Sequence, residues 1–233
     1  NVKQFVAPFM GGTDGVDVTK TQPFSNAILS GQDETKTYSY YSVDKVLDIA
    51  REPELVAYDV LSMPGLTNTT LTDKMISACE DRGDALAVID VAGIYKPKYE
   101  NAGTVSNGSV TSVISTVKAR QTASTAYNSS YGATYYPWVR ISDTITGRGI
   151  WAPPSVAALG AMSFSENKAA LWFAPAGFSR GGLTDGAAGI PVTNVRSRLT
   201  SKERDYLYER NINPIASFPS EGIVIFGQKT LQA

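Results

Sequence analysis

Three aspartates lie in or near predicted strands, where their carboxylates could bind a metal ion or a substrate. Asp90 and Asp143 lie near the carboxyl ends of two predicted strands, and Asp59 lies within a third. Ligands of open α/β sheets bind outside the carboxyl ends of the strands, and Mg²⁺ prefers carboxylate oxygens. One interpretation is therefore a metal-dependent α/β hydrolase. We favour the other, which is capping, turn hydrogen bonds and one buried structural aspartate, because no phosphate-binding glycine loop accompanies the three residues.

Ser155 stands at the start of a predicted helix, a position that suits either a nucleophile or a capping group. The chain has no histidine, which excludes Ser-His-Asp and Cys-His triads as well as histidine metal sites. Ser155 thus has no evident base, and we interpret it as a cap. The single cysteine, Cys79, lies in an apolar helical pattern typical of a buried, inert thiol. We expect a protein that is not an enzyme and has no cofactor and no metal.

The spacing of apolar residues predicts the elements that position these side chains. Three strands are expected, at Leu55–Leu61, Ala85–Val91 and Thr134–Ser142. Helices are expected after a Ser42 cap, over Thr70–Arg82, around Val110–Val117, from Pro153 onward and after a capping box at Thr200. Two apolar segments, Ile215–Phe218 and Ile223–Phe226, close the chain, and at least the second is expected to be a strand. The order predicts an α/β fold, a mostly parallel sheet flanked by helices.

Composition argues against two classes of partner, although scattered residues such as Arg148 and Arg196 could still assemble a basic patch in the folded chain. The chain has 233 residues, 42% of them hydrophobic, which is enough for one well-buried core or two small ones. Its formal net charge is −1, and no Lys/Arg run exceeds two residues, so we expect no direct nucleic-acid binding. No apolar run approaches the roughly 20 residues that span a bilayer, so we expect no membrane insertion.

Arginines and tryptophans are the candidate subunit-interface residues. The arginines lie in polar or glycine-rich stretches, where they are available for ion pairs with a partner: Arg148, Arg180, Arg196 and Arg198. Trp151 and Trp172 suit an interface anchor or a core position equally well, whereas Trp138 lies inside a strand pattern and is expected in the core. A further alternative is a host-glycan binding module in which Trp151 and Trp172 are stacking platforms.

Several stretches in the second half of the chain resemble the tail sheath family of contractile bacteriophages. They are Tyr136-Pro137-Trp138-Val139 followed by Pro153-Pro154-Ser155 and a small-residue helix, the loop Trp172–Gly177, Asn211–Ile215, and the ending Gly222–Leu231. The glycine-rich stretch Gly11–Gly15 is similar to the entry into the family's conserved domain. Each motif is short, and their common order carries the resemblance.

The resemblance implies a subtilisin-like sheath domain without a protease site. It implies a structural subunit that forms stacked hexameric rings with copies of itself around a tail tube. Such subunits contract by rigid-body lattice rearrangement and drive the tube through the host envelope. The implied location is the virion tail, after assembly in the host cytoplasm.

The resemblance also implies how the chain is organised. We expect residues 1–40 to be an irregular glycine-rich lead-in and residues 41–233 to form the α/β sheath domain. Family members continue past Gly227-Gln228-Lys229-Thr230-Leu231 into a helix facing the tube and an extended arm. Tube binding is therefore expected to use regions outside this chain. We expect the fragment alone to be a soluble monomer.

Overall fold

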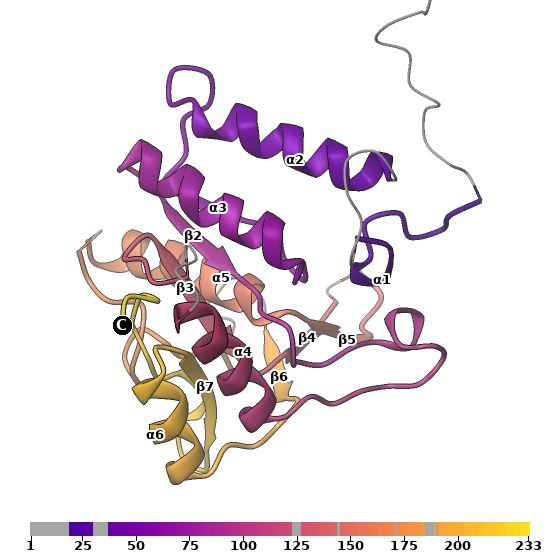
Figure 1. Cartoon of the computed structure of the whole chain (residues 1–233). Coiled ribbons are helices and arrows are strands. Elements are labelled where there is room, and N and C mark those ends of the chain that lie inside the picture. Colours follow the sequence, from indigo (N-terminus) through magenta and orange to yellow (C-terminus); the bar gives the residue numbers. More distant parts are fainter. Residues whose placement is uncertain are drawn as a thin grey trace, which may run out of the picture.

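The computed structural model describes residues 19–29, 37–122, 127–143, 145–170, 172–184, 189 and 191–233 (Figure 1). Its main sheet has five strands in the order β1-β2-β3-β7-β8. Their bounds are Val60–Ser62 (β1), Leu86–Ile89 (β2), Gly132–Tyr136 (β3), Asn213–Phe218 (β7) and Gly222–Ile225 (β8). The pairs β1–β2, β2–β3 and β3–β7 are parallel, and β7–β8 is an antiparallel hairpin. The predicted mostly parallel α/β sheet is confirmed.

Two helices make the crossovers between the first three strands. Helix α3, Thr69–Arg82, joins β1 to β2, and α4, Val110–Thr122, joins β2 to β3. Asn68 caps α3 by accepting a hydrogen bond from the backbone N–H of Leu71, and Gly83 ends the helix in the left-handed conformation at φ 73°. A glycine adopts that backbone without steric cost, so the helix stops there and the chain turns into β2.

A second, smaller sheet has three antiparallel strands in the order β5-β4-β6. They are Val139–Ser142 (β4), Gly149–Ala152 (β5) and Val192–Val195 (β6), with an irregularity between Arg140 and Ile141 where β4 meets β6. The remaining helices are α1 (Asn26–Leu29), α2 (Tyr38–Arg51), α5 (Pro154–Lys168) and α6 (Ser201–Glu209), with a short 3-10 turn at Lys98–Glu100.

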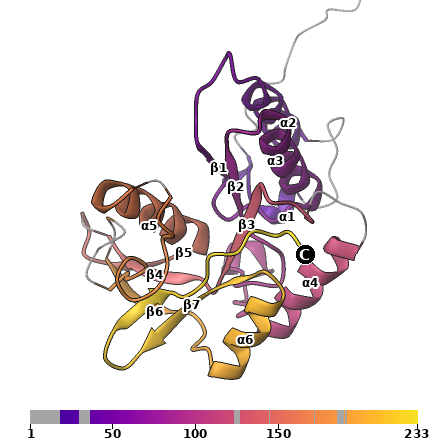
Figure 2. The same ribbon diagram turned by 90° about the vertical axis from the view of Figure 1, so that its left-hand side faces the viewer.

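Strand alternation divides the buried residues into two cores on opposite faces of the main sheet. Ala87 and Ile89 point into the core formed with α2, α3, α4 and α6, whereas Val88 between them points into the other. That second core contains the alanine face of α5 and the inner side of the small sheet (Figure 2). Ala157, Ala158 and Ala161 are buried, and their small size lets α5 approach the sheet closely.

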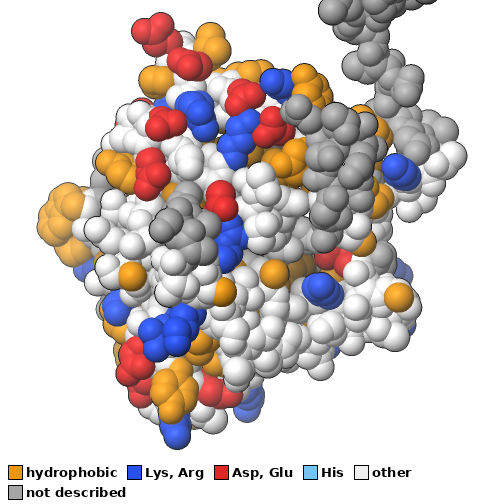
Figure 3. Space-filling view, in the orientation of Figure 1, with side chains coloured by type: hydrophobic (Ala, Val, Ile, Leu, Met, Phe, Trp, Pro, Cys, Tyr) orange, Lys and Arg blue, Asp and Glu red, His pale blue; other side chains and the backbone are white. Residues whose placement is uncertain are grey.

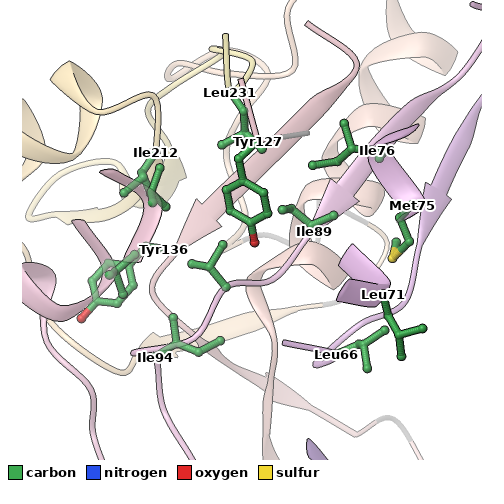
Figure 4. Packing of buried hydrophobic residues seen from close by; sticks show 14 of the residues in the cluster. Leu66, Leu71, Met75, Ile76, Ile89, Ile94, Tyr127, Tyr136, Ile212 and Leu231 are labelled. Carbon is green, nitrogen blue, oxygen red and sulfur yellow. The ribbon is translucent and has the colours of Figure 1, made fainter. Parts of the chain in front are cut away.

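The larger core joins segments that are far apart in the sequence. Figure 4 shows Tyr127, Ile89, Ile76 and Leu231 packed together, although they come from four separate parts of the chain. The backbone N–H of Leu231 also donates to the carbonyl of Gly132 at 2.8 Å. The end of the chain is thereby tied to the start of β3.

Two predicted strands are corrected by the structure. The segment Leu55–Leu61 is strand only from Val60, because the chain forms hydrogen-bonded turns after α2 and leaves Leu55 69% exposed. The segment Thr134–Ser142 is two strands in different sheets. Pro137 separates them, since a proline has no N–H to donate to a ladder and interrupts a central strand.

Helix α2 also begins earlier than predicted, at Tyr38, so Ser42 is inside the helix and is not its cap. The helices at Thr70–Arg82, around Val110–Val117, from Pro153 and after Thr200 are confirmed. The second closing segment is a strand as expected, and the first forms a strand as well. Within the predicted lead-in, residues 26–29 form α1; the stretches Gly11–Gly15 and Ser30–Asp33 lie outside the described residues.

Candidate functional site

Asp90 and Ser155 lie in direct contact at the carboxyl edge of the main sheet. Asp90 follows β2, and Ser155 lies in the first turn of α5, which places the carboxylate at the amino end of that helix. The Ser155 hydroxyl donates to Asp90 Oδ2 at 2.7 Å, and the backbone N–H of Gly65 donates to the same oxygen at 2.7 Å. The backbone N–H of Ser155 approaches Oδ1 at 3.4 Å. The three groups fasten the loop after β1, the end of β2 and the start of α5 to one another.

Burial decides what this constellation can do. Ser155 is 0% exposed and Asp90 is 1% exposed, so no substrate carbonyl reaches the hydroxyl. Burial raises the pKa of Asp90 to about 6, against the hydrogen bonds from Gly65 and Ser155, which lower it. The start of α5 and the carboxylate therefore form a structural junction. The interpretation of Ser155 as a helix cap is wrong, because the N-cap residue of α5 is Pro153 and the Ser155 hydroxyl donates to Asp90 instead. A carboxylate that accepts from a serine could act as its base, but both groups are buried away from any substrate.

The three aspartates of the metal-hydrolase interpretation do not converge. Asp59 is exposed and precedes β1, so it lies at the amino edge of the parallel strands, opposite Asp90. The prediction that Asp59 lies within a strand is wrong. Asp143 follows β4 in the small sheet and orders a turn, accepting from the backbone N–H of Ile145 at 3.0 Å and from the Thr146 hydroxyl. These bonds, with that of Thr146 the largest, lower the pKa of Asp143.

Within the described ranges, no three Cys, Asp or Glu side chains lie close enough together to hold a metal ion. The hydrolase alternative is thus not supported. A pocket of about 670 Å³ does open beside the Asp90 junction, with Met63, Trp138 and Pro153 among its lining residues. Its acidic residue, Glu100, is already engaged by the amide of Asn26. The pocket is mainly apolar and has no evident chemistry.

Two of the predicted interface residues, Trp151 and Arg196, lie together in one cluster. The Arg196 guanidinium lies 4.8 Å from the ring centre of Tyr95 and 4.9 Å from that of Trp151, and its Nε donates to Asn107 at 3.0 Å. Tyr95 also packs 5.1 Å from Trp138, which is buried as predicted. Arg196 therefore holds β6 and β5 against the loop after β2 within this chain.

Trp172 and Arg180 meet through a third residue, on a different part of the surface. Trp172 is 79% exposed and stacks on Phe173 at 4.2 Å, while the Arg180 guanidinium lies 3.8 Å from the Phe173 ring centre. Arg148 and Arg198 are exposed in separate loops. Of the six predicted interface residues, four thus lie in two local clusters, and Arg148 and Arg198 stand apart.

Sequence reasoning missed a cluster of three phenylalanines at the C-terminal end of the fold. The ring centres of Phe178, Phe218 and Phe226 lie 5.1 to 5.5 Å from one another, and Phe178 and Phe226 are half-exposed. Arg204 lies 5.0 Å above Phe218. Phe178 belongs to the loop before β6, Phe218 is the last residue of β7 and Phe226 follows β8, so no local spacing signals the cluster.

Comparison with known proteins identifies similar chains. No family model matches the sequence. A tail sheath protein of Vibrio phage KVP40 is 31% identical over 88 residues, which is 38% of this chain and 12% of that protein. A tail sheath protein of Enterobacteria phage T4 is 29% identical over 80 residues, 34% of this chain and 11% of that protein. The resemblance inferred from the motifs is confirmed, although each match spans about an eighth or less of the relative's length.

One solved structure adds evidence on the fold. It is the sheath complex of an extracellular contractile injection system, PVC, in its contracted state. The similarity has a TM-score of 0.53 and 21% identity, and covers 78% of this chain and 42% of that chain. In the described part of this chain, no helix has both the length and the apolar character that crossing a membrane requires.

Proposed function

We propose that this chain is part of a structural subunit of a contractile tail sheath, which surrounds a tail tube and drives it through the host envelope. The observation that carries the proposal is the similarity to the two phage tail sheath proteins. The shared fold with a contracted sheath complex supports it. The partners are other copies of the same protein, arranged in stacked hexameric rings, and a tail tube protein contacted through regions outside these 233 residues.

The packing supports movement of the domain as a rigid body. The main sheet is covered on both faces, and the Asp90 junction ties β2, the loop after β1 and α5 into one unit. Such a unit keeps its shape while the contacts between subunits change. Contraction then exchanges one set of neighbour contacts for a more stable set, without refolding of the subunit.

The protein is not an enzyme in this proposal. The buried Ser155 hydroxyl and the absence of histidine support that view. The place of action is the virion tail, with assembly in the host cytoplasm. Arg148, Trp172, Arg180 and Arg198 stay proposed as subunit contacts, because their side chains are at least partly exposed. Trp151 and Arg196 would contribute by shaping the surface around their cluster.

Electron microscopy tests the proposal. The complete gene product that contains this sequence, expressed alone at high concentration, is expected to form tubes of stacked six-membered rings. The 233-residue chain at matched concentration is expected to sediment as a monomer. The proposal would be contradicted if the complete gene product stayed monomeric under all assembly conditions, or if it hydrolysed esters in a Ser155-dependent way.

A further inference from the structure

A short loop after α2 presents two apolar side chains directly after two acidic ones. Leu55 is 69% exposed and Val56 is 41% exposed, and Glu52 and Glu54 beside them are exposed too. We call these four residues the acidic knob. Its backbone is ordered by hydrogen bonds from Leu55 and Val56 to the carbonyl of Glu52, and Arg82 donates to the carbonyl of Val56 at 2.7 Å. Within the described part of the chain, neither glutamate forms an ion pair.

One ring of the three-phenylalanine cluster, Phe226, lines a groove whose aromatic and basic residues complement the acidic knob. The groove has a volume of about 390 Å³ and lies between α6 and the β7–β8 hairpin, where Phe226 and Arg204 form part of its wall. Tyr208 also lines it, with the Lys229 ammonium 4.1 Å from the tyrosine ring centre. Asp205 is the one acidic residue in the wall. We call this the aromatic groove; aromatic residues and arginine are enriched in protein–protein interfaces.

The part of the chain that contains the knob has an excess of acidic residues, and the part that contains the groove has an excess of basic residues. Residues 37–110, which include the knob, contain six Lys and Arg against eleven Asp and Glu. Residues 111–233, which include the groove, contain twelve against seven. Acidic side chains crowd the end of the molecule over α2 and α3 (Figure 3). Association is favoured where surfaces of opposite potential meet.

The knob and the groove of one chain cannot meet each other. The α2–β1 loop lies at one end of the molecule and α6 at the other (Figure 1). We propose that the acidic knob of one copy docks into the aromatic groove of a second copy, with Leu55 against Phe226 and the two glutamates facing Arg204 and Lys229. The inference rests on the proposed sheath function and names one contact of the lattice.

A contact of this kind has a defined symmetry. The two surfaces are different patches of the same molecule, so the interface is heterologous, and repetition gives a ring or an open helical array. The contact is small and partly ionic, which suits a lattice that exchanges neighbours. One such contact is too weak to hold two 233-residue chains together in sedimentation, but cross-linking traps the docked pair. Salt weakens it, because the Debye length falls from about 10 Å at 0.1 M to about 3 Å at 1 M.

Cysteine cross-linking between two separately tagged chains tests the contact. One chain carries Leu55→Cys and the other Phe226→Cys, and Cys79 adds little background because it is fully buried. A matched control replaces Leu55→Cys with Ile145→Cys, an apolar residue that is 92% exposed but lies near Arg148 instead of glutamates. We expect about tenfold more mixed dimer from the first pair than from the control, the equivalent of about 1.4 kcal/mol.

Charge reversal adds a second readout that does not depend on the cysteine sites themselves. Glu54→Lys in the Leu55→Cys chain is expected to reduce the mixed dimer to the control level, and Arg204→Glu in the partner chain to restore part of it. Equal yields from the Leu55→Cys and Ile145→Cys chains, or yields unchanged by Glu54→Lys and by 1 M salt, would overturn the contact.

The same cysteines separate this inference from the proposed function. Tubes of the complete gene product that form normally but give no link between positions 55 and 226 would overturn the contact and leave the sheath function standing. Linked dimers without any tubes would support the contact and count against the sheath function.

Discussion

Asp90→Asn isolates the effect of a buried carboxyl group on stability. Asp90 has a pKa of about 6 in the folded protein, against an ordinary value of 3.8, because burial penalises its charged form. The folded state therefore binds a proton more tightly than the unfolded state does. Such a group contributes stability that is fully present below pH 3.8 and is lost as the pH rises through 6.

The size of the effect follows from the two pKa values. One pKa unit corresponds to about 1.4 kcal/mol, so a difference of about two units gives a limit of about 3 kcal/mol. Between pH 4 and pH 7.5 the wild type should lose about 2 kcal/mol of unfolding free energy through this one group. An asparagine in its place accepts from Gly65 and has no charge to bury, so it should not show this loss.

Urea unfolding at several pH values measures the difference. Other carboxyls, such as Glu203, have pKa values lowered by their hydrogen bonds and act in the opposite sense, but they are common to both proteins and cancel. The stability of Asp90→Asn relative to wild type should thus rise by about 2 kcal/mol from pH 4 to pH 7.5. In Ser155→Ala the carboxyl stays titratable and loses a hydrogen bond to its charged form, so the pH dependence should steepen. A difference between Asp90→Asn and wild type that is flat or falls with pH would refute the reasoning.

Three further predictions concern single residues. Burial raises the pKa of Cys79 to about 11, so an aromatic disulfide reagent at pH 8 should leave the native thiol intact and react only after unfolding; fast native reaction would contradict its burial. Thr200→Ala breaks the capping box with Glu203 and should cost about 1 kcal/mol in urea unfolding, with Ser201→Ala as a neutral neighbour. Gly83→Ala places a side chain at φ 73° and should lower the unfolding free energy by about 1 kcal/mol; an unchanged midpoint would argue against the left-handed cap.

Elements with a local physical cause were predicted well. Helix α3 has apolar residues on one side, a glycine where it ends and a strand of continuous apolar residues after it, and each of these signals acts within one or two turns. The capping box at Thr200 is also local, since both of its hydrogen bonds join residues three apart. Errors occurred where the apolar pattern continued past a break. Leu55 belongs to an apolar run but faces solvent, and Pro137 interrupts what looks like one strand.

The candidate site also has features that the sequence predicts and features that it does not. The sequence has no histidine, and that fact alone rules out a histidine-based triad. Spacing alone could not tell whether Asp59, Asp90 and Asp143 share an edge, because that depends on where each strand begins and in which sheet it lies. A strand that starts five residues late moved Asp59 to the opposite edge from Asp90.

The sequence by itself determined the fold class, the parallel order of the first strands, the absence of a histidine-based site and the resemblance to tail sheath proteins. The fold class and the strand order depend on periods of two and 3.6 residues, which reflect burial against near neighbours, and the absence of a histidine site depends on composition. The resemblance depends on short motifs in a common order. Only the tertiary structure decided that Ser155 hydrogen-bonds Asp90 and that Arg196 packs on Trp151 of its own chain. It also decided that Phe178, Phe218 and Phe226 form one cluster. Contacts between distant segments depend on which loops the folded sheets bring together, and no local pattern encodes those contacts.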